Sequence, residues 1–170
     1  MIRIPEPALV VLVGAAGAGK STLAARHFAP GEVLSSDAYR AMVSGDPTDQ
    51  RATRTAFAML HRELERRLAA GRTAVVDATS VTSFARRALG RRATAGGRPA
   101  IAIVLDLGAP LVRARNATRP GRIVPGEVVD RHLRDLAHSL RRGLGNEGFA
   151  AIHVLRTAAE VDALVIERTH

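Results

Sequence analysis

The sequence predicts an α/β fold of the doubly wound type, in which helices cover both faces of one five-stranded parallel sheet. Two observations predict it. Five short apolar runs alternate with helical patterns, and the glycine-rich stretch GAAGAGKST directly follows the first run. The apolar residues of these runs are continuous rather than alternating, which is typical of parallel strands buried on both faces. Because 170 residues suit one domain with a substantial core, we expect a single domain over residues 1–170.

The expected strands are rich in Val, Ile and Ala, and helical patterns lie between them. The strands span residues 8–13, 32–35, 73–77, 100–107 and 151–156. The helical segments are the run STLAARHF after the glycine-rich stretch, a segment starting near Ala38, residues 49–68, a segment from Ser83 to Gly96 or Gly97, and a segment from Pro125 to Gly143 or Gly145. In the segment 49–68, apolar residues recur at helical spacing, and Gly71 stands where a helix stop is expected.

The composition narrows the class of protein. The formal net charge is +9, which favours partners that carry phosphate. All but one of the 25 basic residues are arginine, so many of them are expected simply to cover solvated helix faces; the one lysine is Lys20, inside the glycine-rich stretch. Aromatic residues make up 3% of the chain, which argues against a platform of stacked bases along a long single strand.

The sequence also bears on the compartment. It contains no cysteine, which excludes disulfides and thiolate metal sites. No apolar run approaches the roughly 20 residues that a membrane span needs, and the start MIRIPEPALVVLVG lacks the pattern of a signal peptide. We therefore expect a cytoplasmic protein with no membrane partner.

The stretch GAAGAGKST matches the phosphate-binding loop pattern GxxxxGK[ST] in full, between a predicted strand and a predicted helix. Its glycines let backbone N–H groups point at phosphate oxygens, and the helix N-terminus adds partial positive charge. We predict that Lys20 bridges the β and γ phosphates of a nucleoside triphosphate and that Ser21 ligates magnesium. A glycine-rich turn without a ligand is the alternative. The predicted nucleotide-binding residues here are Gly14, Ala15, Ala16, Gly17, Ala18, Gly19, Lys20, Ser21 and Thr22.

Acidic residues follow two of the predicted strands. Asp37 comes two residues after the second strand, where its carboxylate could accept the proton of an attacking hydroxyl; the alternative is that it caps a helix starting at Ala38. Arg40 lies one helical turn further on and could bind an acceptor phosphate, or it is a plain surface arginine. Asp77 ends the third strand and resembles the acidic residue that positions magnesium, with Asp106 as the second choice.

An arginine-rich segment, RARNATRPGRIV, follows the fourth predicted strand. A lid over about residues 113–126 that brings guanidinium groups to the transferred phosphate would have such a composition. An exposed basic helix is the alternative. The arginines of this segment that we predict to bind nucleotide are Arg115, Arg119 and Arg122, of which Arg115 is also predicted to be catalytic. The six histidines show no metal-ligand spacing, and we interpret them as structural or surface residues.

Taken together, the stretches GAAGAGKST, EVLSSDAYR, DPTDQ, FAMLHRELERRLAAGRTAVVDAT and RARNATRPGRIV resemble the 5'-kinase module of bacterial polynucleotide kinase-phosphatase, the RNA end-healing enzyme. The likeness runs from about Leu9 to Arg156. It implies a P-loop kinase-like fold and the transfer of a γ-phosphate from ATP or another NTP to a 5'-hydroxyl end of RNA or DNA, with Mg²⁺ or Mn²⁺ as the metal. The family has an asparagine after Asp-Ala-Thr, where this chain has Ser80.

The resemblance also implies roles for residues at matching positions. It makes Asp37 the general base on the 5'-hydroxyl and Arg40 a contact to phosphate on the acceptor strand, with Gln50 of the DPTDQ segment in the same acceptor site. The resemblance implies that Lys20 and Ser21 bind the NTP phosphates and magnesium and that Arg115 and Arg122 bind the donor phosphates. Together with Asp77 after the third strand, Ser21 forms the predicted metal site.

Two other functions are open at this stage. A small-molecule kinase would use the same donor site for a sugar, nucleoside or antibiotic hydroxyl. A nucleotide-dependent switch or binding module would position water, and it would rarely need a base such as Asp37 after the second strand. The expected partner is a 5'-OH polynucleotide end, and a homodimer is one option for the assembly.

Overall fold

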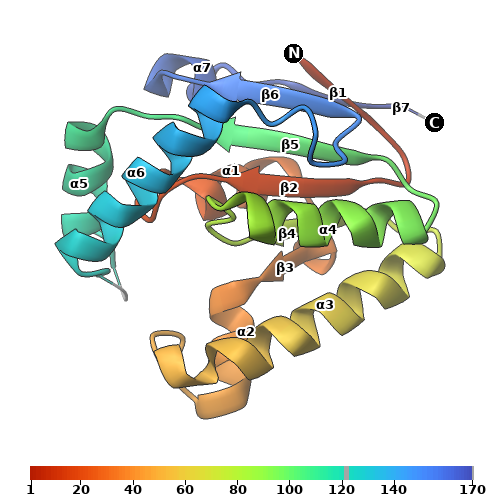
Figure 1. The fold of residues 1–170 in the computed structure, drawn as a ribbon, viewed down its shortest axis with the longest axis horizontal. Coiled ribbons are helices and arrows are strands. Elements are labelled where there is room, and N and C mark those ends of the chain that lie inside the picture. Colours follow the sequence, from red (N-terminus) through yellow and green to blue (C-terminus); the bar gives the residue numbers. More distant parts are fainter. Residues whose placement is uncertain (121–122, 170) are drawn as a thin grey trace.

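The computed structural model describes residues 1–120 and 123–169. Its main sheet has five parallel strands in the order β3-β4-β2-β5-β6 (Figure 1). These strands are β2 (Leu9–Val13), β3 (Val33–Ser35), β4 (Ala74–Asp77), β5 (Ala100–Leu105) and β6 (Ala151–Leu155). Each lies inside a predicted run, so the predicted five-stranded parallel sheet is confirmed.

The helices account for the intervals between the strands. They are α1 (Lys20–His27), α2 (Ser36–Ser44), α3 (Thr53–Ala69), α4 (Ser83–Ala95), α5 (Ala109–Ala117), α6 (Gly126–Arg142) and α7 (Ala158–Asp162), with short 3-10 helices η1 (Pro30–Glu32) and η2 (Gln50–Ala52). The predicted stop after residue 68 is confirmed, because α3 ends at Ala69 and Gly71 has a φ of 67°, in the left-handed region.

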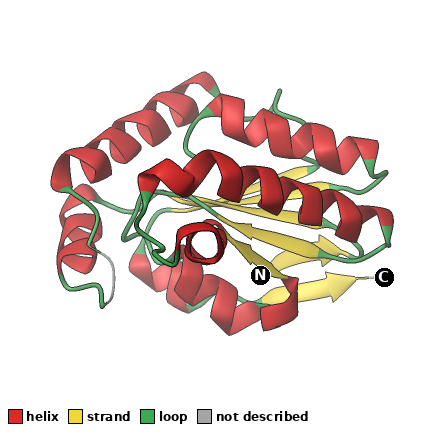
Figure 2. Ribbon diagram, turned by 90° about the horizontal axis from the view of Figure 1, so that it is seen from below, coloured by secondary structure: helices red, strands yellow, loops and turns green. Residues whose placement is uncertain are grey.

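The central strand explains why the apolar runs are continuous. Leu9, Val11 and Val13 of β2 are fully buried against α3 and α4. The alternate residues Val10 and Leu12 are equally buried on the other face, where α1 packs. Figure 2 shows the sheet between two layers of helices. A strand buried on both faces has no polar positions, which is the doubly wound arrangement.

Helix α2 begins two residues earlier than predicted. Ser35 is its N-cap, and the Ser35 hydroxyl accepts a hydrogen bond of 3.4 Å from the backbone N–H of Ala38. Asp37 therefore lies inside the first turn of the helix, and the alternative in which Asp37 is the cap is wrong.

The structure contains elements that the sequence patterns did not indicate. β1 (Ile2–Pro5) and β7 (Ile166–Thr169) pair in parallel as a separate two-stranded sheet, which brings both chain ends together. Helix α5 takes up the first part of the predicted lid, and α7 follows β6. In the described part of the chain, no helix is long and apolar enough to cross a membrane.

Candidate active site

The glycine-rich stretch forms a tight loop between β2 and α1. Gly17 and Gly19 have φ angles of 86° and 95°, which side-chain-bearing residues rarely adopt. Gly17 also lies against α5, since a Cβ atom there would come within 2.5 Å of the Val112 carbonyl oxygen. Both glycines are thus required by the local backbone, and the loop presents the N-terminus of α1 at the carboxyl edge of the sheet.

Lys20 is the first residue of α1 and is buried, with 8% of its surface exposed. Its Nζ donates hydrogen bonds to the carbonyl oxygens of Gly14 (3.0 Å) and Ala15 (2.9 Å). The loop therefore wraps around the ammonium group and fixes its position. A guanidinium group is larger and planar and does not fit the same enclosure.

A cavity of 420 Å³ lies over this loop and extends along α1. Helix α5 forms one side of it, and an Arg115 guanidinium nitrogen would be 3.6 Å from a Cβ atom placed on Gly19. Of the predicted nucleotide-binding residues, the structure places Gly17, Gly19, Lys20, Ser21, Thr22, Arg115 and Arg119 around this donor cavity. Ala16 lines the neighbouring cavity, while Gly14, Ala15 and Ala18 support the loop from behind. Arg122 lies outside the described residues.

The two residues predicted to hold a metal lie side by side. The Ser21 hydroxyl donates a hydrogen bond of 2.7 Å to Oδ2 of Asp77, which ends β4 and is 7% exposed. A hydroxyl and a carboxylate are hard oxygen ligands, the kind that Mg²⁺ prefers, and Mg²⁺ commonly takes few protein ligands beside substrate phosphates. The pair therefore fits a magnesium ion bound together with a nucleotide. Asp106 lies elsewhere, with an Oδ2 atom 3.9 Å from Arg156.

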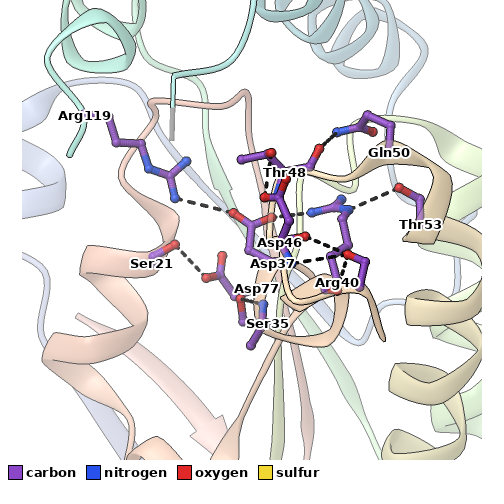
Figure 3. Close-up of polar contacts among 12 residues, drawn as sticks. Ser21, Ser35, Asp37, Arg40, Asp46, Thr48, Gln50, Thr53, Asp77 and Arg119 are labelled. Carbon is purple, nitrogen blue, oxygen red and sulfur yellow. Dashed lines mark hydrogen bonds and ion pairs between the residues drawn. The ribbon is translucent and has the colours of Figure 1, made fainter. Parts of the chain in front are cut away.

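A second cavity of 480 Å³ adjoins the donor cavity, and Lys20, Ser21 and Arg119 line both. Strand β3, which precedes Asp37, does not neighbour β2; β4 lies between them. Asp37 nevertheless faces the phosphate-binding loop across the end of β4 (Figure 3). This acceptor cavity contains all three predicted acceptor-binding residues, which are Asp37, Arg40 and Gln50.

Asp37 lies between two arginines (Figure 3). Arg40 donates a hydrogen bond of 2.5 Å to Oδ1, while a guanidinium nitrogen of Arg119 is 3.6 Å from Oδ2. The Arg40 side chain is 9% exposed and also donates a 3.2 Å hydrogen bond to the Thr53 hydroxyl. Arg40 is therefore a buried cation in the acceptor cavity, and the interpretation of it as a plain surface arginine is wrong.

The predicted lid begins as helix α5 and continues as a loop. Asn116, which is buried, closes the base of this loop: its amide nitrogen donates to the Val124 carbonyl at 2.8 Å, and its amide oxygen accepts from the Val124 N–H at 3.2 Å. Arg119 lies between these two tied ends and reaches both cavities. Arg113 points elsewhere and forms a 2.8 Å ion pair with Asp130 of α6. The lid segment thus supplies Arg115 and Arg119 to the site.

The position where this chain has Ser80 has unusual backbone geometry. Ser80 has a φ of 47°, the left-handed region that asparagine adopts more readily than serine. Its carbonyl accepts a 3.0 Å hydrogen bond from Arg86, and the neighbouring Thr79 carbonyl accepts one of 3.0 Å from the Gly14 N–H. The segment after β4 therefore supports the phosphate-binding loop through its backbone, whichever side chain stands at residue 80.

Sequence analysis missed several residues that line the two cavities. In the donor cavity these are Arg26 and His27 of α1 and Val161 and Asp162 of α7. In the acceptor cavity they include Phe57 of α3 and Arg131 and His132 of α6. Two of the histidines interpreted as structural or surface residues line the site, His27 in the donor cavity and His132 in the acceptor cavity. Burial lowers the pKa of His27, with Arg26 contributing in the same direction.

Most of the chain matches a known protein family. The family model described as an AAA domain matches residues 9–142. The chain belongs to this family. It is accordingly a P-loop domain of the kinase-like type, a fold that binds nucleotides. Among curated protein sequences, none matches this AAA domain.

Solved structures resemble this AAA domain at the level of the fold. A candidate kinase from Chloroflexus aurantiacus aligns with a TM-score of 0.65 and 22% identity, over 93% of this chain and 94% of its own. A chain of the Pnkp1/Rnl/Hen1 RNA repair complex aligns with a TM-score of 0.69 and 24% identity, over 82% of this chain and 47% of that one. A gluconokinase from Sinorhizobium meliloti aligns with a TM-score of 0.57 and 19% identity, over 94% and 87%.

Proposed function

We propose that this protein is an ATP-dependent polynucleotide 5'-hydroxyl kinase. The surroundings of Asp37 support this reaction most directly. A carboxylate faces the phosphate-binding loop, and the buried cation Arg40 lies 2.5 Å from it. Beyond its hydrogen bonds to Asp37 and Thr53, the Arg40 guanidinium has further N–H donors that can bind an acceptor phosphate. An acceptor with a hydroxyl beside a phosphate, as at the 5' end of a nucleic acid strand, meets both groups at once.

The proposed reaction is an in-line displacement at the γ-phosphorus. The 5'-hydroxyl oxygen forms a bond to phosphorus, and the bond from phosphorus to the β,γ-bridging oxygen breaks. The proton of the hydroxyl passes to the Asp37 carboxylate, and the products are a 5'-phosphate end and a nucleoside diphosphate. Lys20 and Arg115 offset the negative charge on the phosphoryl oxygens, because both line the donor cavity.

Ser21 and Asp77 would hold magnesium, as their geometry fits a hydroxyl and a carboxylate that share one ion. The ion, when bound, neutralises charge on the β and γ phosphates. The chain's own contribution is to fix these two side chains, one at the start of α1 and the other at the end of β4.

The test is transfer of labelled γ-phosphate from ATP to a 5'-OH oligonucleotide, with a matching oligonucleotide that already carries a 5'-phosphate as the control. We expect transfer to the first alone. Absence of transfer to any 5'-OH end would refute the proposed substrate. Hydrolysis of ATP with no transfer to any hydroxyl would favour a nucleotide-dependent switch.

A small-molecule kinase is the second candidate. The resemblance of the fold to a gluconokinase favours it, and Arg40 would also suit a small hydroxylated acid. The same transfer assay with gluconate, sugars and free nucleosides in place of the oligonucleotide distinguishes the two. Efficient transfer to one of these, together with none to oligonucleotides, would replace the first proposal by the second.

A further inference from the structure

A third cavity, of 390 Å³, adjoins the acceptor cavity between α3, α4 and α6. We call it the Phe84 groove, after the exposed residue on its rim. Four residues line both the groove and the acceptor cavity: Phe57, Thr79, Arg131 and His132. An acceptor that fills the first cavity can therefore continue into the second along the protein surface.

Aromatic rings are concentrated in this groove. The chain contains four phenylalanines, and two of them, Phe57 and Phe84, line it. Phe84, the second residue of α4, is 80% exposed, which is unusual for a large apolar side chain. Phe57 packs edge-on against His61, with ring centroids 5.9 Å apart. An exposed ring next to an acceptor site offers a face on which a flat, aromatic part of the acceptor can stack.

Two charged residues of the groove, Arg131 and Asp135, favour different parts of a ligand. Arg131 lines the junction with the acceptor cavity and is exposed. Asp135 lines the groove and not the acceptor cavity, and its carboxylate forms no hydrogen bond or ion pair among residues 1–120 and 123–169. A carboxylate disfavours phosphate beside it and accepts hydrogen bonds from the N–H groups of a base. A phosphate therefore suits the Arg131 end, and a nucleobase suits the interior.

We propose that the Phe84 groove binds the nucleobase of the second nucleotide of the acceptor strand, stacked on Phe84. This inference rests on the proposed kinase function, in which the 5'-terminal nucleoside occupies the acceptor cavity. It adds a reason for preferring an oligonucleotide over a mononucleotide, since only a longer acceptor reaches both cavities. One base, rather than a long stacked strand, is consistent with the few aromatic residues of the chain.

The experiment compares two 5'-OH dinucleotides, one intact and one with an abasic second residue, on the wild type and on Phe84→Ala. Stacking of a base on an aromatic ring contributes about 1–3 kcal/mol, so we expect the abasic dinucleotide to have a KM about tenfold higher on the wild type. On Phe84→Ala, the two KM values should be equal. Val165→Ala, which shortens another exposed apolar residue (58% exposed), is the matched control and should behave as wild type.

The inference is overturned if Phe84→Ala retains the wild-type preference for the intact dinucleotide, or if the wild type has no such preference. A failure of the kinase proposal is recognised separately, because the wild type would then phosphorylate neither dinucleotide. In that case, binding of a dinucleotide tests whether the Phe84 groove holds a base. A dinucleotide with 2-aminopurine as its second base should change its fluorescence on the wild type and not on Phe84→Ala, and no change on the wild type would also overturn the inference.

Discussion

At the scale of single residues, the two arginines beside Asp37 differ in how firmly they are held. Arg40 is nearly buried and has a second hydrogen bond to Thr53. Arg119 is 33% exposed, lies 3.6 Å from the carboxylate and lines the donor cavity as well. Donor phosphates can therefore compete for Arg119, whereas Arg40 stays with Asp37 and the acceptor.

Asp37→Asn tests the proposed base. The amide cannot accept the proton, and a general base contributes about 10²- to 10⁴-fold, so we expect kcat for phosphate transfer to fall by about that factor. Nucleotide affinity, measured by equilibrium binding, should change little, because Asp37 does not line the donor cavity. Asp106→Asn is the matched control, since Asp106 lines neither cavity. Full activity in Asp37→Asn would refute the assigned mechanism.

Glu63 provides a test of pH dependence away from the site. Hydrogen bonds from Arg66 and Arg67 lower its pKa from 4.5 to about 2. The pKa is depressed in the folded state, so the stabilisation is fully present above about pH 4.5 and is lost as the pH falls toward 2. Because the Glu63 side chain is 23% exposed and solvent screens the ion pairs, we expect them to contribute only about 1 kcal/mol to the free energy of unfolding. The difference in unfolding free energy between wild type and Glu63→Gln should therefore shrink over this range; a difference independent of pH would contradict the assignment.

At the scale of elements, a buried ion pair ties α4 to the segment after α6. Arg86 is fully buried and donates hydrogen bonds of 2.5 and 2.8 Å to the Glu147 carboxylate. It also donates to the Ser80 and Val81 carbonyls, which belong to the segment that supports the phosphate-binding loop. The ion pair therefore connects α4 and the segment after α6 to the backbone that supports the phosphate-binding loop.

Glu147→Gln should destabilise the protein markedly. Removing one partner of a buried pair leaves an uncompensated charge, which costs about 3–5 kcal/mol. Glu65→Gln is the matched control, because the Glu65 side chain is 56% exposed in its pair with Arg92, and it should cost well under about 1 kcal/mol. Urea unfolding of both variants provides the measurement. An equal loss of unfolding free energy in the two variants would show that the buried ion pair contributes no more to stability than the exposed one.

The elements differ in how far the sequence could predict them. β2 and β5 are apolar throughout, and β4 is apolar up to Asp77, because both faces of these strands are buried; such runs are easy to recognise. β1 and β7 alternate or are partly exposed, and their partners are far apart in the chain, so local patterns did not indicate them. The cavity-lining residues of α6, such as Arg131, were missed for a related reason: only the tertiary fold places them beside Asp37. The phosphate-binding loop was predictable because its spacing is itself local.

At the scale of the whole molecule, the basic charge makes acceptor binding dependent on salt. Each phosphate contact on a single strand contributes about −0.7 to the slope of log K against log salt. If the protein contacts at least two phosphates of a 5'-OH decanucleotide, the slope should be about −1.4 or steeper. Fluorescence anisotropy at several salt concentrations measures it. Arg131→Gln should reduce the slope by about 0.7, whereas Arg72→Gln, whose residue lines neither cavity, should not. A slope near zero would count against a polynucleotide acceptor.

The small sheet formed by β1 and β7 has a consequence for the order of events during protein synthesis. Residues 2–5 are synthesised before their partners, which are residues 166–169. The phosphate-binding loop and β4 can meet earlier, because both lie in the first half of the chain. β1 cannot pair with β7 until residues 166–169 have been synthesised. The two-stranded sheet of β1 and β7 therefore closes only after all five strands of the main sheet have been synthesised.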